Sequence, residues 1–470
     1  MPALNFEPKH KPGLDKEFCP AALWNRAFRD LVARAGRAVP VSVALVRKDD
    51  TVSVFRTAVL PHEEDYAELN ERYVERLIKF LLWQKGGHRI WLSGDPRIAD
   101  FIAGVYGPRG IRSFDFHFMG EKVYDHPMEI RHCPAEDMPA PREMARALGR
   151  HFNGCRVGFD LGGSDRKSAA LIDGKVVFSE EVPWSPSFER DPSYHIQGID
   201  DSIRRAAEKL PRVDAIGGSA AGIYINNEPR VASLFRGISQ DDFKKHVRGI
   251  FLELKKRWNN VPVEVINDGE VAALAGSIAM NDNAVLGISM GSSQAAGYVT
   301  PEGTITPWLN ELAFVPIDYR PDAPADEWSG DIGCGVQYFS QQAVARLAAK
   351  AGLAAKAGLD FPLGMALPER LAEVQTLMKS GDARAAKIFE TIGVYFGYAV
   401  AHYADFYDFR NLLILGRVTS SPGGEMIIDR AKAVLADEFP ELSERIQMRT
   451  PDERDRRLGQ AVAAASLPVL

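Results

Sequence analysis

The stretch VGFDLGGSDRKSAALIDGKVVFSEE, residues 157–181, contains two apolar segments joined by a turn of glycines and a serine. This arrangement predicts a β-hairpin. A turn that directs several N–H groups at phosphate oxygens needs glycine, because residues with a Cβ resist positive φ and hold the anion away. Asp160, Gly162, Gly163 and Ser164 therefore suggest a phosphate turn. A glycine-rich turn that only closes a hairpin is the more common alternative.

A second turn of the same kind follows in NAVLGISMGSSQAAGYV, residues 283–299, where Gly291 and Ser292 occupy the turn. Between the two turns, INDGEVAALAG places Asn267 and Asp268 after a predicted strand and before a predicted helix. One interpretation is an N-cap, because both side chains satisfy free N–H groups of a first helical turn. The other is a carboxylate at the end of a strand, where open α/β sheets bind ligands. The order of turn, carboxylate and turn favours phosphoryl transfer.

The composition is that of a globular protein. At 470 residues, with 46% hydrophobic residues, the chain can form about three domains. The net charge of −6 and the absence of a long basic run argue against nucleic acid or an anionic membrane as a partner. The charged N-terminal segment does not resemble a signal peptide, and no apolar run approaches the roughly 20 residues of a membrane helix. We therefore expect a cytoplasmic protein. Its four cysteines agree with a reducing compartment, because they are far apart in the sequence and form no CxxC pair.

The N-terminal third has an α/β pattern. Residues 40–60 predict a hairpin, residues 69–85 a helix with apolar positions at helical spacing, and residues 88–96 a strand that ends in a glycine turn. The same order of hairpin, helix and strand recurs from residue 156 onward. The N-terminal part is therefore either a degenerate copy of the following unit, which has lost the glycine turn, or an unrelated α/β module.

The proline-bearing segment CPAEDMPAPREMARALGRHFNG predicts a domain boundary near residue 150. We expect an α/β domain over residues 1–150, a first lobe over 151–275 with the first phosphate turn, and a second lobe over 276–470 with the second phosphate turn.

From residue 156 to the C-terminus the sequence resembles the ROK family of sugar kinases and repressors, which shares its fold with actin and hexokinase. Six segments carry the resemblance, in the family's order: GFDLGGSDRKSAAL, INDGEVAALAGS, NAVLGISMGSSQAAGYV, NELAFVPID (310–318), GCGVQYFS (333–340) and NLLILGRVTSSPGGEMI (411–427). The resemblance implies a two-lobed, actin-like or ribonuclease H-like ATPase fold behind the extra N-terminal α/β domain.

By this resemblance, Asp268 is the general base that takes the proton of a sugar hydroxyl as it attacks the γ-phosphate of ATP. Asp160 holds Mg²⁺ through water. The other roles implied fall into three groups. The phosphates contact Gly162, Gly163, Ser164, Gly291 and Ser292. The adenosine is bordered by Gly416 and Gly424. The sugar binds Asn267, Glu311 and Ser233.

The sequence also departs from the family pattern. The family binds a structural zinc with one histidine and three cysteines, whereas this chain has Phe314, Glu327 and Ser329 at three of those positions and retains only Cys334. Zinc needs about four ligands, so we expect no zinc site. In the second phosphate turn, Ile288 replaces a residue whose hydroxyl would donate to phosphate.

Three functions remain open at this stage. The first is an ATP-dependent kinase for a sugar, sugar derivative or cyclitol. The second is a sugar-responsive regulator, although residues 1–150 show no basic recognition helix. The third is a catalytically reduced protein that acts in sugar or sugar phosphate binding or regulation, and the altered GISMGSS turn favours it. In each case the expected partner is a small molecule, and a homodimer remains an alternative to a monomer.

Overall fold

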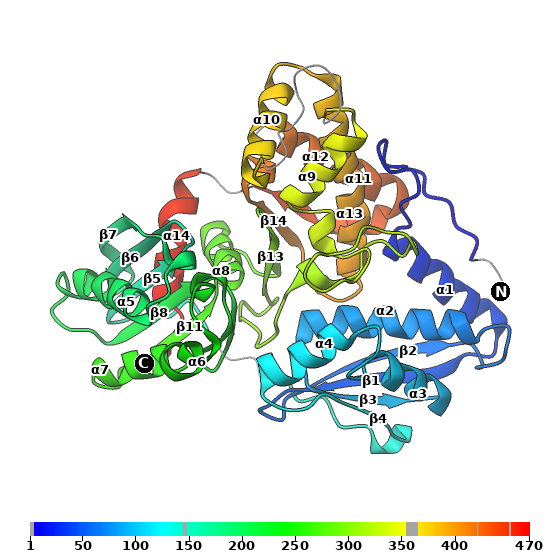
Figure 1. Ribbon diagram of the computed structural model, residues 1–470, viewed down its shortest axis with the longest axis horizontal. Helices are drawn as coiled ribbons and strands as arrows, with labels where there is room; N and C mark the ends of the chain where they lie inside the picture. Colours follow the sequence, from blue (N-terminus) through cyan, green and yellow to red (C-terminus); the bar gives the residue numbers. More distant parts are fainter. Residues whose placement is uncertain (1–3, 144–147, 354–364, 421, 451–452) are drawn as a thin grey trace.

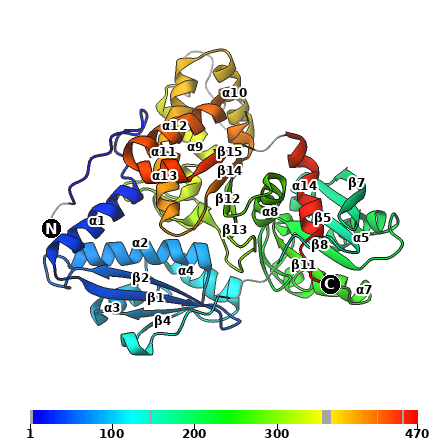
Figure 2. The same cartoon turned by 180° about the vertical axis from the view of Figure 1, so that it is seen from behind.

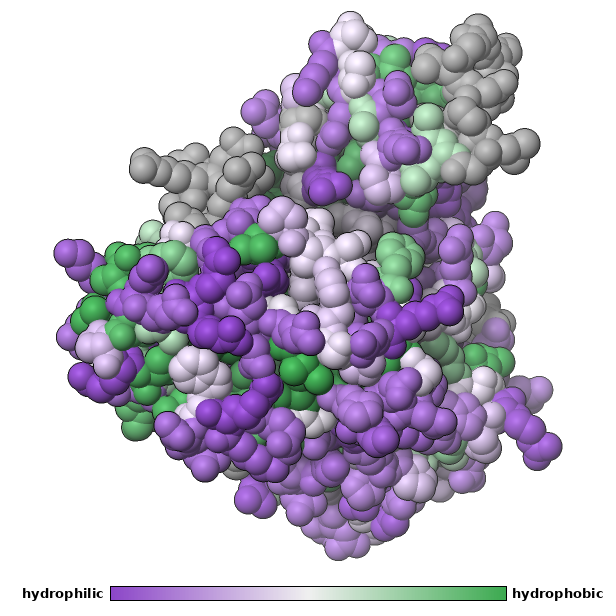
Figure 3. All heavy atoms as spheres, turned by 60° about the vertical axis from the view of Figure 1, so that its left-hand side comes forward, coloured by the Kyte–Doolittle hydropathy of each residue, from purple (hydrophilic) through white to green (hydrophobic). Residues whose placement is uncertain are grey.

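The computed structural model describes residues 4–143, 148–353, 365–420, 422–450 and 453–470. Its three larger sheets each form the centre of one part of the molecule: an N-terminal module, a first lobe and a second lobe (Figure 1). Within these ranges, no helix combines the length and apolar character that crossing a membrane requires. The face in Figure 3 is mainly hydrophilic, with hydrophobic residues in small groups.

The N-terminal module is a four-stranded sheet in the order β2-β1-β3-β4, with helices packed on it (Figure 1). The predicted hairpin, helix and strand are all present. Its elements are α1 (Ala21–Ala35), β1 (Val39–Val46), β2 (Val52–Val59), α2 (Ala67–Lys85), β3 (Arg89–Ser93), α3 (Pro96–Val105), α4 (Ser113–His117) and β4 (Glu129–His132).

The first lobe is a five-stranded sheet in the order β11-β8-β5-β6-β7. The hairpin predicted from residue 156 is a meander of three strands, and α7 is preceded by a π-helical turn (Phe243–Val247). The remaining elements are β5 (Cys155–Leu161), β6 (Asp165–Ile172), β7 (Lys175–Pro183), α5 (Pro192–Ala207), β8 (Ala215–Ala220), β9 (Ile223–Ile225), β10 (Glu228–Val231), α6 (Gln240–Asp242), α7 (Ile250–Arg257) and β11 (Val263–Asn267).

The second lobe contains a sheet in the order β13-β12-β14-β15, covered by a group of helices. Its elements are α8 (Asp268–Met280), β12 (Val285–Met290), β13 (Gln294–Val299), α9 (Gln341–Lys350), α10 (Leu367–Lys379), α11 (Ala383–Ala404), β14 (Asn411–Leu415), α12 (Pro422–Glu438), α13 (Pro440–Arg445) and β15 (Gln447–Arg449). The last helix, α14 (Glu453–Ala465), returns to pack on β5, β6 and β8 of the first lobe (Figure 2). The domain boundaries at residues 150 and 275 stay predictions; α14 also packs on α8 of the second lobe.

The N-terminal module is not built like the first lobe. Strand β3 runs antiparallel to β1, whereas β8, the strand at the same place in the element order, runs parallel to β5. The cause is the additional antiparallel strand β7, which reverses the chain once more before helix α5. The two units therefore differ in strand direction after the hairpin, and the origin of the N-terminal module stays a hypothesis.

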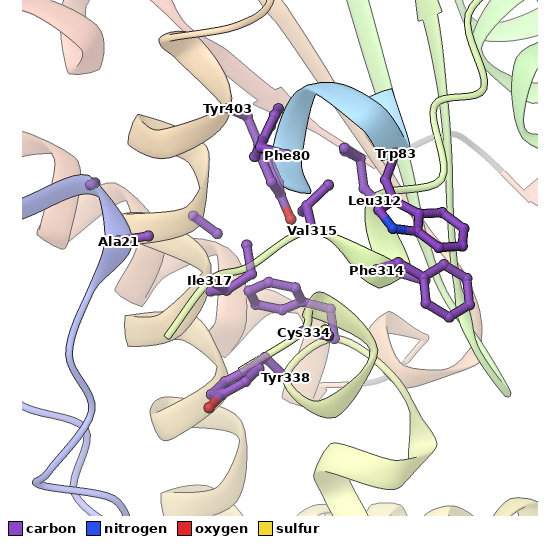
Figure 4. Packing of buried hydrophobic residues seen from close by; sticks show 14 of the residues in the cluster. Ala21, Phe80, Trp83, Leu312, Phe314, Val315, Ile317, Cys334, Tyr338 and Tyr403 are labelled. Carbon is purple, nitrogen blue, oxygen red and sulfur yellow. The ribbon is translucent and has the colours of Figure 1, made fainter. Parts of the chain in front are cut away.

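The N-terminal module and the second lobe share one hydrophobic core. A single cluster of buried side chains includes Phe28 of α1, Trp83 of α2, Tyr403 of α11 and, outside these helices, Phe314. The first lobe has a separate cluster around Phe159. Figure 4 shows the Trp83 indole beside the Phe314 ring, and their ring centroids are 4.2 Å apart. The module is therefore packed as part of the second lobe.

Candidate functional site

Three parallel strands of the first lobe end at one edge of its sheet. Strand β5 pairs with β8, and β8 with β11, so that Leu161, Ala220 and Asn267 are neighbours at the carboxyl ends. Asp160 is the cross-strand partner of Ser219, whose Oγ donates to Asp160 Oδ1 at 2.6 Å. This is the edge at which open α/β sheets bind ligands.

Lys167 is a basic residue at this edge that the sequence analysis did not single out. It lies directly across from Asp160 in the β5–β6 pair, with Nζ 3.6 Å from Asp160 Oδ2 and 3.1 Å from Asp165 Oδ1. Only 16% of its side chain is exposed. Lys167 therefore places a positive charge beside the predicted phosphate turn, and the register of the hairpin was the signal that could have identified it.

The first predicted phosphate turn is open to solvent. Gly162 N donates to Asp165 O at 2.9 Å and Trp184 Nε1 donates to Gly162 O at 2.7 Å, which fixes the turn. Gly163 and Ser164 are exposed, and a Cβ on Gly163 would meet no atom within 4 Å. Neither glycine has positive φ, so the argument from left-handed backbone geometry was wrong here. The two glycines instead leave space for an anion to approach the backbone closely.

The second turn has the same open character. Gly291 has no positive φ, and a Cβ there would have only Ser293 O nearby, at 3.7 Å. Ser292 is exposed. Ile288, which raised doubt about this turn, is fully buried in the core and does not face the turn. Ser289, one position further along β12, is partly exposed, so it is the hydroxyl of this strand that a ligand can reach.

Asn267 and Asp268 form the junction of β11 and α8. Asn267 is the N-cap residue, since its Oδ1 accepts from Gly269 N at 2.7 Å, and its Nδ2 donates to Gly222 O at 2.7 Å. The capping interpretation is therefore correct for Asn267, whose side-chain oxygen and amide are both engaged by the backbone. Asp268 accepts from the same Gly269 N–H at 3.0 Å and remains partly exposed.

Three carboxyl groups from three elements influence each other at this site. Burial, followed by the charge of Asp160, raises the pKa of Asp268 to about 6. Burial and the charge of Asp268 raise the pKa of Glu311 to about 7. Burial also raises the pKa of Asp160, against the hydrogen bond from Ser219 and the charge of Lys167. A cluster of mutually perturbed carboxyl groups at a strand edge is typical of a functional site.

Glu311 is positioned by the N-terminal module. The last carbonyl groups of a helix have no partner within it, and at the end of α2 the oxygens of Trp83 and Gln84 accept from Glu311 N at 3.0 Å and Asn310 N at 2.9 Å. Asn310 also has a positive φ of 51°, which marks a tight reversal. The backbone next to Glu311 is therefore fixed by a helix outside the two lobes.

The other predicted ligand contacts are distributed unevenly. Gly416, at φ 100°, follows β14 and lies against the end of β12, where a Cβ would be 2.3 Å from Met290 O. It therefore adjoins the second turn. Gly424 packs in the first turn of α12, where a Cβ would be 2.0 Å from Thr419 O. Ser233 is exposed at the start of a 3₁₀ turn (Ser233–Phe235), and within the described part of the chain nothing links its side chain to the three carboxyl groups.

The residues at the family's zinc positions do not fit a metal. Phe314 stacks on Trp83, Ser329 Oγ donates to Asp326 Oδ2 at 2.8 Å, and Cys334 is fully buried with its Sγ 4.0 Å from Ile332 O. In the ranges that the structure describes, no group of three or more His, Cys, Asp and Glu side chains is placed to hold a metal ion. Of these residues, Phe314 packs against Trp83 of the N-terminal module, while Ser329 and Cys334 make contacts within the segment.

The comparisons with known proteins agree with this architecture. No family model matches the sequence, and no curated protein matches it. Among solved structures, the chain is similar to a ROK hexokinase from Thermus thermophilus, with 20% identity over 66% of this chain and 97% of the hexokinase, at a TM-score of 0.50. It is also similar to a ROK family transcriptional regulator, a homologue of the E. coli MLC protein, with 17% identity over 67% of this chain and 78% of the regulator, at a TM-score of 0.50.

The two lobes, with their sheets, have the actin-like ATPase fold. More particularly, their fold is that of ROK proteins, as the sequence resemblance predicted. Each match leaves about a third of the chain uncovered. Since both a sugar kinase and a regulator match, the fold by itself does not decide between these two functions.

Proposed function

We propose that this protein transfers a phosphate group from ATP to a hydroxyl group of a sugar, sugar derivative or cyclitol, with Asp268 as the general base. One observation carries the proposal: Asp268 lies at the ligand-binding edge of the sheet and its pKa is raised to about 6. A general base is most effective when its pKa lies near the working pH. A carboxyl group that only caps a helix has no need of this shift.

The residues around Asp268 support complementary roles. Mg²⁺ binds with one or two carboxylates and keeps several waters, and Asp160, coupled to Asp268 by charge, suits that requirement. Bound there, Mg²⁺ would neutralise charge on the phosphates of ATP. The open turns at Gly163 and Gly291 leave room for these phosphates, and Lys167 adds a positive charge beside the first of them.

Because the chain is similar to both a hexokinase and a regulator, features of this chain must decide between a kinase and a regulator. Regulators that bind DNA need a basic recognition element. The N-terminal module is instead a four-stranded α/β sheet that shares its core with the second lobe. This arrangement favours the kinase.

The test is a phosphoryl-transfer screen with Mg·ATP against hexoses, amino sugars and cyclitols. Three proteins are compared: the wild type, Asp268→Asn, and Asp191→Asn as a matched control that changes the cap of α5. We expect turnover of at least one acceptor by the wild type and the control, and none by Asp268→Asn. No turnover with any acceptor, together with no ATP binding by calorimetry, would reject the kinase.

A further inference from the structure

A cavity lies between the N-terminal module, the first lobe and the second lobe, next to the proposed catalytic site. The cavity has a volume of about 100 Å³ and is open to solvent. Asn267, the neighbour of Asp268, forms part of its wall. The turn between β1 and β2 forms the opposite part with Arg47 and Lys48.

The positive charges at this cavity already have partners. The Arg47 guanidinium donates to Thr51 Oγ1 at 2.7 Å, to Ser53 Oγ at 2.8 Å and to Glu143 Oε2 at 3.0 Å. Lys48 Nζ is 3.4 Å from Asp125 Oδ2. An anionic ligand would have to displace carboxylates to reach either charge. The cavity therefore favours a neutral ligand.

Two hydroxyl groups at the cavity are buried without a hydrogen-bond partner among the residues that the structure describes. They are Tyr124 Oη and Thr306 Oγ1, on side chains that are 1% and 9% exposed. A buried hydroxyl group without a partner costs free energy that a ligand can recover. Each can donate and accept one hydrogen bond, which suits the hydroxyl groups of a ligand better than a purely apolar group.

Aromatic faces complete the lining. Trp308 lines the cavity; its ring stacks on Tyr298, with ring centroids 5.7 Å apart and an angle of 8° between the planes, and Lys85 Nζ lies over the ring, 3.0 Å from its centroid. Tyr224 lines the first-lobe side. Rigid aromatic rings provide apolar contact area for the C–H faces of a pyranose ring, while hydroxyl groups around them bind its edges. The Tyr224 ring and the two buried hydroxyl groups thus offer apolar and polar contacts of the kind that a carbohydrate ring uses.

We propose that this cavity binds a second, neutral sugar ring of the acceptor, so that the substrate is a disaccharide or another glycoside. The proposal rests on the proposed function, because Asn267 connects the cavity to Asp268, where the reacting ring would bind. The N-terminal module then determines substrate class: it supplies Tyr124 and the β1–β2 turn, and thereby separates glycosides from monosaccharides.

The experiment is isothermal titration calorimetry without ATP, so that binding is measured apart from catalysis. The probes are glucose, maltose, cellobiose, sucrose and glucose 6-phosphate. The proteins are the wild type, Tyr124→Phe and Thr306→Val, which remove the two hydroxyl groups and little else. We expect at least one disaccharide to bind tenfold or more tightly than glucose, and each variant to weaken that binding roughly fivefold to tenfold, as for one neutral hydrogen bond.

A thermal unfolding scan separates this role from a structural one. Because the hydroxyl groups lack partners in the protein, their removal should leave the melting temperature unchanged or raise it, whereas a structural role predicts a decrease. The proposal is overturned if no disaccharide binds better than glucose, if glucose 6-phosphate binds best, or if the variants lose stability rather than affinity. Disaccharide binding by a protein that phosphorylates no acceptor and binds no ATP would support this site and reject the kinase. Phosphorylation of glucose without a preference for disaccharides would support the kinase and reject this site.

Discussion

Asp268→Asn should raise the free energy of unfolding at neutral and alkaline pH while it abolishes phosphoryl transfer. The pKa of Asp268 is raised from 3.8 to about 6, first by burial and then by the charge of Asp160. The folded protein thus holds this proton more tightly than the unfolded chain does, so the ionised group destabilises the fold fully above about pH 6 and progressively less as the pH falls toward 3.8.

A difference of about 2 pKa units corresponds to about 3 kcal/mol. Since Asp268 is partly exposed, solvent screening reduces the expected gain to about 1–2 kcal/mol. Urea unfolding at pH 8 and pH 4 measures it, and most of the gain should disappear at pH 4. Asp191→Asn is the control: hydrogen bonds from Ser193 lower the pKa of Asp191, so its replacement should bring no gain at pH 8. No gain at pH 8 for Asp268→Asn, or an equal gain at both pH values, refutes the reasoning.

Three further outcomes are expected. Phe314→Ala should lower the free energy of unfolding by about 3–5 kcal/mol, because the ring is buried against Trp83; a loss below about 1 kcal/mol in urea would contradict the shared core. Gly416→Ala should lower the melting temperature and weaken binding of a non-hydrolysable ATP analogue, since Gly416 has a φ of 100°; an unchanged melting temperature argues against this geometry. Ser219→Ala should raise the pKa of Asp160 and shift the acid limb of the pH–rate profile to higher pH; an unshifted profile would exclude Asp160 from the reaction.

The fold of the two lobes could be predicted because its determinants are local. The turns at Gly162 and Gly291 each lie between short apolar strands, the junction at Asp268 lies between a strand and a helix, and their order along the chain is that of one known architecture. The number of strands before α5 and the return of α14 to the first lobe could not be predicted. The return of α14 depends on contacts between segments far apart in sequence, for which periodicity gives no signal. Strand β7 instead pairs with its sequence neighbour β6, where Ile172 lies opposite Lys175 across a tight turn.

The candidate site divides in the same way. Asp160 and Asp268 follow from their positions at strand ends, and the structure couples them through charge. Lys167 was not predicted as a site residue, because its position beside Asp160 depends on the register between β5 and β6. Ile288 was misinterpreted because the side chains of a strand alternate, and its own points into the core. In both cases the error concerns the face of a strand on which a side chain lies, which changes from one residue to the next.

The N-terminal module holds the segment in which the family's zinc ligands would lie. The segment that would carry the zinc ligands is held by Asp331, whose carboxylate lies 3.3 Å from Lys79 Nζ and 3.6 Å from Arg76 Nη1. Both cations belong to α2, whose end fixes the backbone of Glu311. Buried charges are favourable only when every partner is in place, so the segment depends on the module. The same docking of α2 brings the β1–β2 turn to the cavity beside Asp268. The N-terminal module therefore both holds the segment that contains Asp331 and lines the cavity beside Asp268.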